Sequence, residues 1–87
     1  MKIHKLKIRP QFFNDIAFGR KTFELRKDDR VGGYQVGDRL KLMEYNSEKG
    51  YTGRWYMVEI TYKLAGFSGL IDGYCLLGIK PLCGIVN

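Results

Sequence analysis

The chain has 87 residues, of which 45% are hydrophobic and 14% aromatic, enough for one small core and too few for a second domain. The first residues carry charges at alternate positions, and no window holds the roughly 20 apolar residues of a membrane span, so neither a signal peptide nor a membrane partner is expected. The net charge of +6 is concentrated in residues 1–30, where nine Lys or Arg stand against four acids, and this indicates an electropositive face that attracts phosphates.

The first part of the chain predicts a strand followed by a short helix. Residues 3–8 alternate in hydrophobicity, with His4 in the phase of the apolar side chains, as in a half-exposed strand. Residues 11–18 then place apolar side chains at helical spacing, between Pro10, which suits a first helical position, and Gly19, which suits the residue after a helix end.

A second strand is expected directly after this helix. Residues 22–27 alternate, so that Phe23 and Leu25 share one face while Glu24 and Arg26 share the other. The alternation predicts that the two apolar side chains face the core and that the charged pair faces away from it.

Three more strands are predicted at residues 39–46, 55–64 and 74–79, separated by turns that contain glycine. The inward phase of the first of these continues to Glu44, which would bring a carboxylate toward the core. In the second, Tyr62 shares the face of the inward-pointing side chains.

This order provides one helix for a five-stranded sheet. A sheet that curls into a barrel, with the helix at one end, leaves fewer exposed edges than an open sheet. The sequence therefore predicts a single α+β domain over residues 1–87 that is mostly β: a small barrel of about five strands with one short helix.

Metal, cofactor and disulfide chemistry are not expected. His4 is the only histidine, and Cys75 and Cys83 lack the close spacing of a zinc or redox pair. Two free thiols fit a reducing compartment, so a cytoplasmic protein is expected.

The charged run, residues 19–30, contains the pattern Gly-x-Lys-x-x-Glu-x-Arg at Gly19, Lys21, Glu24 and Arg26. This pattern resembles the signature of ASCH domains, a branch of the PUA-like β-barrels. The resemblance implies a PUA-like barrel with a cleft between the helix and the barrel, lined by the signature residues, that admits RNA or a nucleotide.

The resemblance extends over roughly residues 4–80 and leaves the tail, residues 81–87, outside it. Short segments around the signature are similar to one uncharacterised ASCH-like subfamily of bacteria and their phages, catalogued as domain of unknown function 3850. These segments begin at His4, Pro10, Arg26, Val36, Glu44, Tyr51 and Ile60.

The residue types also suit a phosphate-binding site. Glu24 and Arg26 on one strand face are close enough to pair, and a guanidinium oriented by a carboxylate presents its remaining donors to a phosphate or a base edge. Lys21 follows a helix C-terminus, whose dipole favours the charged form, so a cationic anchor is expected there. The candidate ligand-binding or nucleic-acid-binding residues are Lys21, Thr22, Glu24, Arg26, Arg30, Glu44, Lys7 and His4.

Several of these candidates also have a purely structural interpretation. The charges of the signature suit a solvated, salt-bridged strand face, and a lone histidine such as His4 suits packing. A buried Glu44 needs a partner, for which an arginine of the charged run is expected. Trp55, Tyr34 and Tyr51 could each stack on a base, and Trp55 equally suits packing on the outer wall of the barrel.

The leading expectation is an RNA- or nucleotide-binding module without catalysis. The alternative is a small amidohydrolase acting on a modified nucleoside such as acetylated cytidine, because some bacterial ASCH proteins hydrolyse that compound with the signature lysine, a threonine and a glutamate. Glu24 stands where those enzymes carry a second threonine, so hydrolysis would need a rearranged set of Lys21, Glu24 and Glu44. A third interpretation is an accessory protein that binds another protein.

Overall fold

The computed structural model describes residues 1–87, with one five-stranded sheet and one helix. In chain order the elements are β1 (Ile3–Ile8), α1 (Pro10–Ala17), β2 (Phe23–Lys27), β3 (Arg39–Asn46), β4 (Gly50–Ala65) and β5 (Tyr74–Pro81). The predicted order of a strand, a helix and four strands is confirmed, and β4 begins earlier than predicted. No helix has the length and apolar character that a membrane crossing requires.

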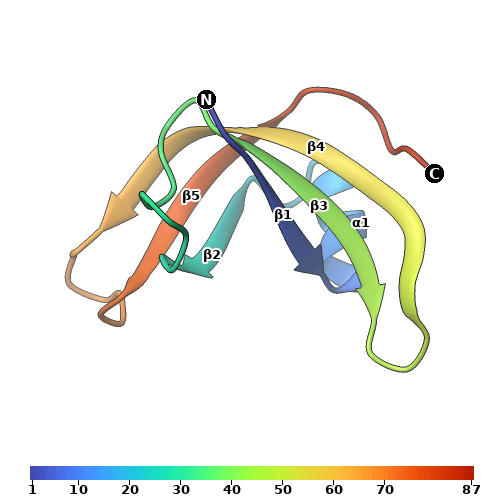
Figure 1. Ribbon diagram of the computed structural model, residues 1–87, viewed down its shortest axis with the longest axis horizontal. Coiled ribbons are helices and arrows are strands. Elements are labelled where there is room, and N and C mark those ends of the chain that lie inside the picture. The colour runs from blue at the N-terminus through green and yellow to red at the C-terminus, as the bar shows by residue number, and fades with distance from the viewer.

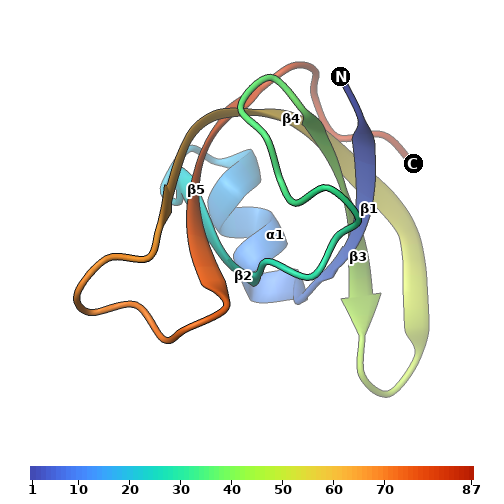
Figure 2. The same cartoon turned by 60° about the vertical axis from the view of Figure 1, so that its left-hand side comes forward.

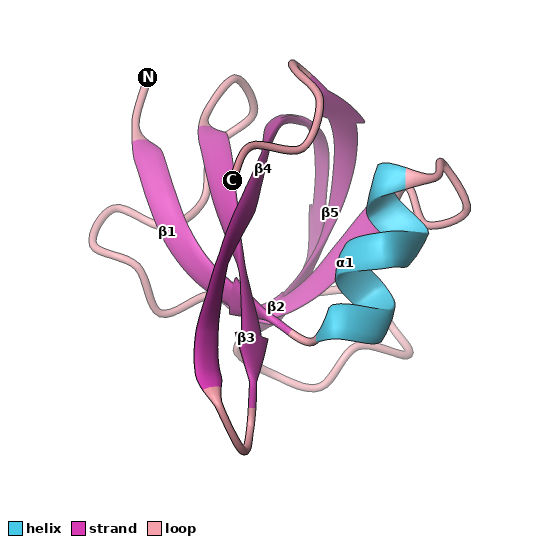
Figure 3. Ribbon diagram, turned by 90° about the vertical axis from the view of Figure 1, so that its right-hand side faces the viewer, coloured by secondary structure: helices cyan, strands magenta, loops and turns pink.

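The sheet curls into a half-barrel around the helix. Its strand order is β1-β3-β4-β5-β2, with β1 parallel to β3 and the other neighbours antiparallel. The 16-residue β4 arches across the molecule (Figure 1), and α1 lies inside the curve (Figure 2). Figure 3 shows the helix at one side of the curled sheet and the β3–β4 hairpin projecting beyond it. The predicted mostly-β fold with one short helix is therefore confirmed.

The core fills the space between the concave face of the sheet and α1. The helix contributes Phe13 and Ile16, because its apolar stripe faces the sheet. Tyr34, from the loop between β2 and β3, is also buried there, so it is a core residue and is not available to a nucleotide. The remaining core residues come from the strands: Leu6, Ile8, Leu40, Leu42, Tyr56, Val58, Ile60, Cys75, Leu77 and Ile79.

The predicted orientation of β2 is wrong. Glu24 is buried with 3% of its surface exposed, whereas Phe23 and Leu25 are exposed. The antiparallel register pairs Glu24 with Leu77 of β5, and directly paired residues point to the same face of a sheet. Because Leu77 faces the core, Glu24 does too, and the charged signature lies on the concave side of the half-barrel.

The orientation predicted for the end of β4 is also wrong at Tyr62. The register with β5 shifts between Ile60 and Tyr62, and such an irregularity moves the following side chain to the other face. Ile60 therefore stays in the core, and Tyr62 is exposed.

Side chains close the seam between the two edge strands, β1 and β2. Arg26 donates from Nη2 to the carbonyl of Lys7 at 2.9 Å, and Arg30 donates from Nη2 to the carbonyl of Lys5 at 3.0 Å. Two carbonyls at the free edge of β1 therefore accept hydrogen bonds from guanidinium groups, where a neighbouring strand would otherwise donate.

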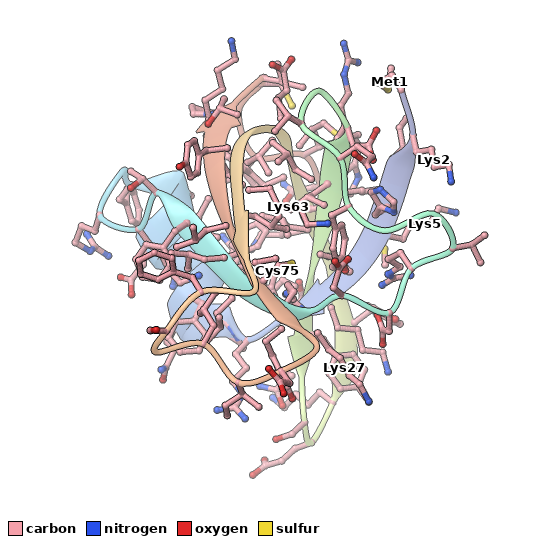
Figure 4. The ribbon with its side chains drawn as sticks, turned by 90° about the vertical axis from the view of Figure 1, so that its left-hand side faces the viewer. Met1, Lys2, Lys5, Lys27, Lys63 and Cys75 are labelled. Atoms are coloured by element: carbon pink, nitrogen blue, oxygen red, sulfur yellow. The ribbon has the colours of Figure 1, made fainter.

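The loop of residues 28–38 is fastened beside this seam. Lys63 of β4 reaches it (Figure 4), with Nζ at 2.8 Å from Asp28 Oδ2 and 2.8 Å from the carbonyl of Tyr34. The hydrogen bond from Lys63 holds the pKa of Asp28 below its usual value. On the other side of the loop, Lys2 Nζ donates to the carbonyl of Val31 at 2.8 Å.

Replacing Arg30 with alanine is expected to lower the free energy of unfolding by about 1 kcal/mol, because it removes hydrogen bonds to Lys5 and to the hydroxyl of Tyr34. Urea unfolding followed by tryptophan fluorescence measures the change. Arg20→Ala is the control, since Arg20 makes an exposed ion pair with Asp15 outside the seam. If the two variants lost equal free energy of unfolding, Arg30 would not stabilise the fold by closing the seam.

Candidate functional site

A cleft of about 460 Å³ opens between β2 and the segment in which β1 passes into α1. Four of its nine lining residues are basic and one is acidic, so the lining has a net charge of +3. The lining residues are Lys7, Ile8, Arg9, Phe12, Lys21, Phe23, Glu24, Leu25 and Arg26. The signature residues Lys21, Glu24 and Arg26 therefore lie together in one cleft, with Lys7.

Glu24 is held by two cations at the base of this cleft. Its Oε1 accepts a hydrogen bond from Lys21 Nζ, and its Oε2 accepts one from Arg26 Nε at 2.8 Å. Lys21 also donates to the carbonyl of Phe23 at 2.7 Å. The predicted pairing of Glu24 with Arg26 is confirmed, and both oxygens of the buried carboxylate are occupied.

The two cations retain hydrogen-bond donors for a ligand. A lysine ammonium has three donors, of which Lys21 uses one on Glu24 and one on Phe23. A guanidinium has five, of which Arg26 uses one on Glu24 and one on Lys7. Because Glu24 holds both groups, together with the carbonyl of Phe23 for Lys21 and that of Lys7 for Arg26, their remaining donors are preorganised for an anion.

Two further cations, Lys7 and Arg9, are exposed and make no hydrogen bond or ion pair with their side chains. Lys7 Nζ lies 4.4 Å from the ring centroid of Tyr45, a contact that is weak at an exposed position. Sequence reasoning missed Arg9, although its place directly before the helix-starting Pro10 puts it at the strand-to-helix junction.

The cleft also has an aromatic wall that the sequence analysis missed. Lys21 Nζ lies 5.4 Å from the ring centroid of Phe12 and 4.9 Å from that of Phe23. Phe23 is 46% exposed, which leaves part of its ring open to a ligand. The alternation of β2 places Phe23 in the core, and this prediction is wrong because the strand faces the other way.

The other predicted site residues do not line this cleft. Thr22 is exposed beside a small separate depression, and Arg30 spans the seam. His4 is buried, and its Nε2 lies 2.9 Å from Oδ2 of Asp38. Burial tends to raise the pKa of Asp38, but hydrogen bonds to His4 and to two backbone amides outweigh it and hold that pKa below its usual value. The His4–Asp38 pair therefore fixes the start of β3 to β1.

Glu44 is buried as predicted, but the prediction of its partner is wrong. Arg54 of β4, outside the charged run, donates from Nε to Oε1 at 2.9 Å and from Nη2 to Oε2 at 2.8 Å, and the Thr52 hydroxyl donates to Oε1 at 2.7 Å. The hydrogen bonds from Arg54 hold the pKa of Glu44 below its usual value, against the effect of burial. In the sheet, strands β4 and β5 lie between β3, which carries Glu44, and β2, which carries part of the charged run. The partner of Glu44 therefore comes from β4, the hairpin neighbour of β3.

The tail pairs with β4 at Trp55. The backbone of Trp55 exchanges two hydrogen bonds with that of Val86, at 2.8 and 2.9 Å, and Lys41 Nζ lies 4.5 Å from the tryptophan ring. Residues 82–86 therefore cover part of the free edge of β4, and Trp55 lies in the outer wall of the half-barrel.

Comparison with known proteins identifies relatives of this chain. It is 36% identical over 76 residues to an uncharacterized 12.9 kDa protein in the GpA 3' region of Escherichia phage P2, an alignment that covers 87% of this chain. The alignment covers 66% of the phage protein. The family described as "Domain of unknown function (DUF3850)" matches residues 3–79. This chain therefore belongs to that family of uncharacterised domains.

Proposed function

We propose that the protein binds single-stranded RNA or a nucleotide in the cleft lined by Lys7, Lys21, Glu24 and Arg26. The observation that carries the proposal is the unbalanced charge of the cleft, where four basic side chains face one carboxylate whose oxygens are both occupied. An excess of fixed cations in a hollow attracts phosphates.

The shape and chemistry of the walls favour a nucleotide over a simple anion. Arg26 keeps donors in a planar fork, which suits the oxygens of a phosphate. Phe23 offers a partly exposed ring whose centroid lies 4.9 Å from Lys21 Nζ, and aromatic rings are common stacking surfaces for bases. A ligand with a phosphate and a flat ring would contact both.

The ion pairs of the two buried glutamates support binding over hydrolysis. A general base must accept a proton, but both oxygens of Glu24 are bonded to cations, and those of Glu44 are bonded to Arg54 and Thr52. Lys21 donates hydrogen bonds to Glu24 and to the carbonyl of Phe23, an arrangement that suits an anchor for an anion.

Salt dependence tests the proposal. Binding of a fluorescein-labelled octa-adenylate RNA is measured by anisotropy between 50 mM and 500 mM KCl. Three net positive charges in the cleft predict contacts to about three phosphates, and therefore a log–log slope of about −2 at roughly 0.7 per phosphate. A flat response, or no binding at the lowest salt concentration, would refute RNA binding.

A pair of lysines on the same strand supplies the variants. Lys7→Ala is expected to weaken binding and to reduce the magnitude of the slope by about 0.7, because one phosphate contact is lost. Lys5→Ala is the matched control, since Lys5 is exposed on β1 but does not line this cleft. Release of cytidine from acetylated cytidine by the wild type, abolished in Lys21→Ala, would identify a hydrolase instead.

A further inference from the structure

A second hollow, of about 770 Å³, adjoins the cleft on the other side of the β1–α1 junction. It lies between the start of α1 and the β3–β4 hairpin, whose contribution is Tyr45, Asn46 and Ser47. The two hollows share three lining residues, Lys7, Ile8 and Arg9. No acidic side chain lines the second hollow, so the shared cations are its only charges.

The hairpin brings an aromatic pair to this second hollow. Tyr45 and Tyr51 are directly opposite each other in the register of β3 and β4, and their ring centroids are 5.0 Å apart at an interplanar angle of 75°. Tyr51 is exposed, and Tyr45 is half-buried. The edge-to-face contact braces the Tyr45 ring, so it forms a rigid platform.

Lys7 connects the platform to the first cleft. Its ammonium lies over Tyr45 at 4.4 Å, while its backbone carbonyl accepts the hydrogen bond from Arg26. An exposed ammonium on a ring is weakly held, so a phosphate near Lys7 can draw it away and leave the ring face for a base. The order along the surface is then an aromatic side chain, cations, and a second aromatic side chain.

We propose that the two hollows form one groove for a single strand of at least two consecutive nucleotides. One base lies beside Phe23, the next stacks on Tyr45, and the phosphodiester between them meets Lys7 and Arg9. This inference rests on the proposed function and adds a length requirement to it. The alternation of rings and cations matches the repeat of a nucleic-acid strand, whereas an acidic peptide would leave both rings unused.

A mononucleotide fills one hollow only. A dinucleotide adds one stacked base without a second loss of translational freedom, so its affinity is expected to exceed that of the mononucleotide by roughly 5- to 100-fold. Further nucleotides extend beyond the two hollows and add little.

Competition against the labelled octa-adenylate tests this length dependence. The competitors are adenosine monophosphate and unlabelled oligoadenylates of two, three, four and eight nucleotides. The expected result is one large step in affinity between the mononucleotide and the short oligomers, followed by a plateau. Tyr45→Ala is expected to remove the step, so that the short oligomers bind no more tightly than the mononucleotide.

Variants separate stacking from a change of structure. Tyr45→Phe keeps the ring and is expected to retain the step, and Tyr62→Ala is the control because Tyr62 is exposed but lines neither hollow. Circular dichroism checks that each variant is folded.

The outcomes distinguish this inference from the function on which it rests. A mononucleotide that binds as tightly as the octamer would overturn the groove and leave nucleotide binding standing. Absence of binding to any of these ligands would overturn both. Competition by tetraglutamate as effective as that by tetra-adenylate would replace the nucleic acid by an acidic peptide and overturn the groove as described.

Discussion

Replacing both Lys21 and Arg26 with alanine is expected to lower the free energy of unfolding by about 3 kcal/mol. The two substitutions remove both cations from Glu24 and leave its buried carboxylate without a charged partner. Removing one partner of a buried ion pair usually costs about 3 to 5 kcal/mol, and we expect the lower value here because the cleft lets water approach the carboxylate. Chemical denaturation in urea measures it.

A third substitution supplies the critical comparison. Adding Glu24→Gln removes the unpaired charge, so the triple variant is expected to regain most of the lost stability. Lys27→Ala, an exposed change on the same strand without an ion pair, is the control. If the triple variant were as unstable as the double, Glu24 would not be the cause. If its stability is regained as expected, the triple variant is a folded protein that lacks the cations of the signature, and loss of RNA affinity in it reflects the cleft and not unfolding.

Replacing Arg54 with alanine is expected to cost about 2 to 3 kcal/mol at neutral pH, because Glu44 keeps only the hydrogen bond from Thr52. The loss depends on pH. The pKa of Glu44 is lowered in the folded protein, so its pairing stabilises the wild type above the unfolded value near 4.5 and is lost as pH falls through the folded value.

The difference in stability between wild type and Arg54→Ala is therefore expected to narrow as pH falls from 7 toward 3. In the variant, burial without a cation favours protonated Glu44, so acid removes the unpaired charge. Denaturation at several pH values measures this, and Glu44→Gln provides a background in which this titration is absent. A difference that stays constant with pH would show that Glu44 is not responsible.

The order and type of the elements could be predicted because each follows from local pattern. Alternation identified the strands, and Pro10 and Gly19 enclosed the one helix. The curl of the sheet followed from the mismatch between five strands and a single helix. These features need no knowledge of which strands pair.

The orientation of β2 depends on pairing and could not be read from its own residues. Both faces of this strand carry large side chains. Considered alone, burial of the apolar Leu25 has a lower free-energy cost than burial of the Glu24 carboxylate. The register with Leu77 decides the matter, and two nearby cations make the buried carboxylate stable. Opposite charges two residues apart, at Glu24 and Arg26, were the available signal for an inward-facing ion pair.

The same dependence on pairing explains the partner of Glu44. The charged run contains several arginines, but the sheet order places β2 at the edge opposite β1, with β4 and β5 between β2 and β3. Arg54 follows Glu44 across a hairpin, and that hairpin was the available signal, since facing strands bring such residues together.

At the seam between β1 and β2, the side chains of Arg26 and Arg30 donate to the backbone of β1, and no backbone hydrogen-bond ladder joins the two strands. Arg26 belongs to that seam and to the cleft at once, so closure of the seam and occupancy of the cleft are thermodynamically linked through one guanidinium. A ligand that strengthens the Arg26–Lys7 contact must bind more tightly to the closed seam, and by the same factor, since such coupling is reciprocal. Opening of the seam between β1 and β2 is therefore expected to become rarer when such a ligand occupies the cleft, without any strand of the sheet unpairing.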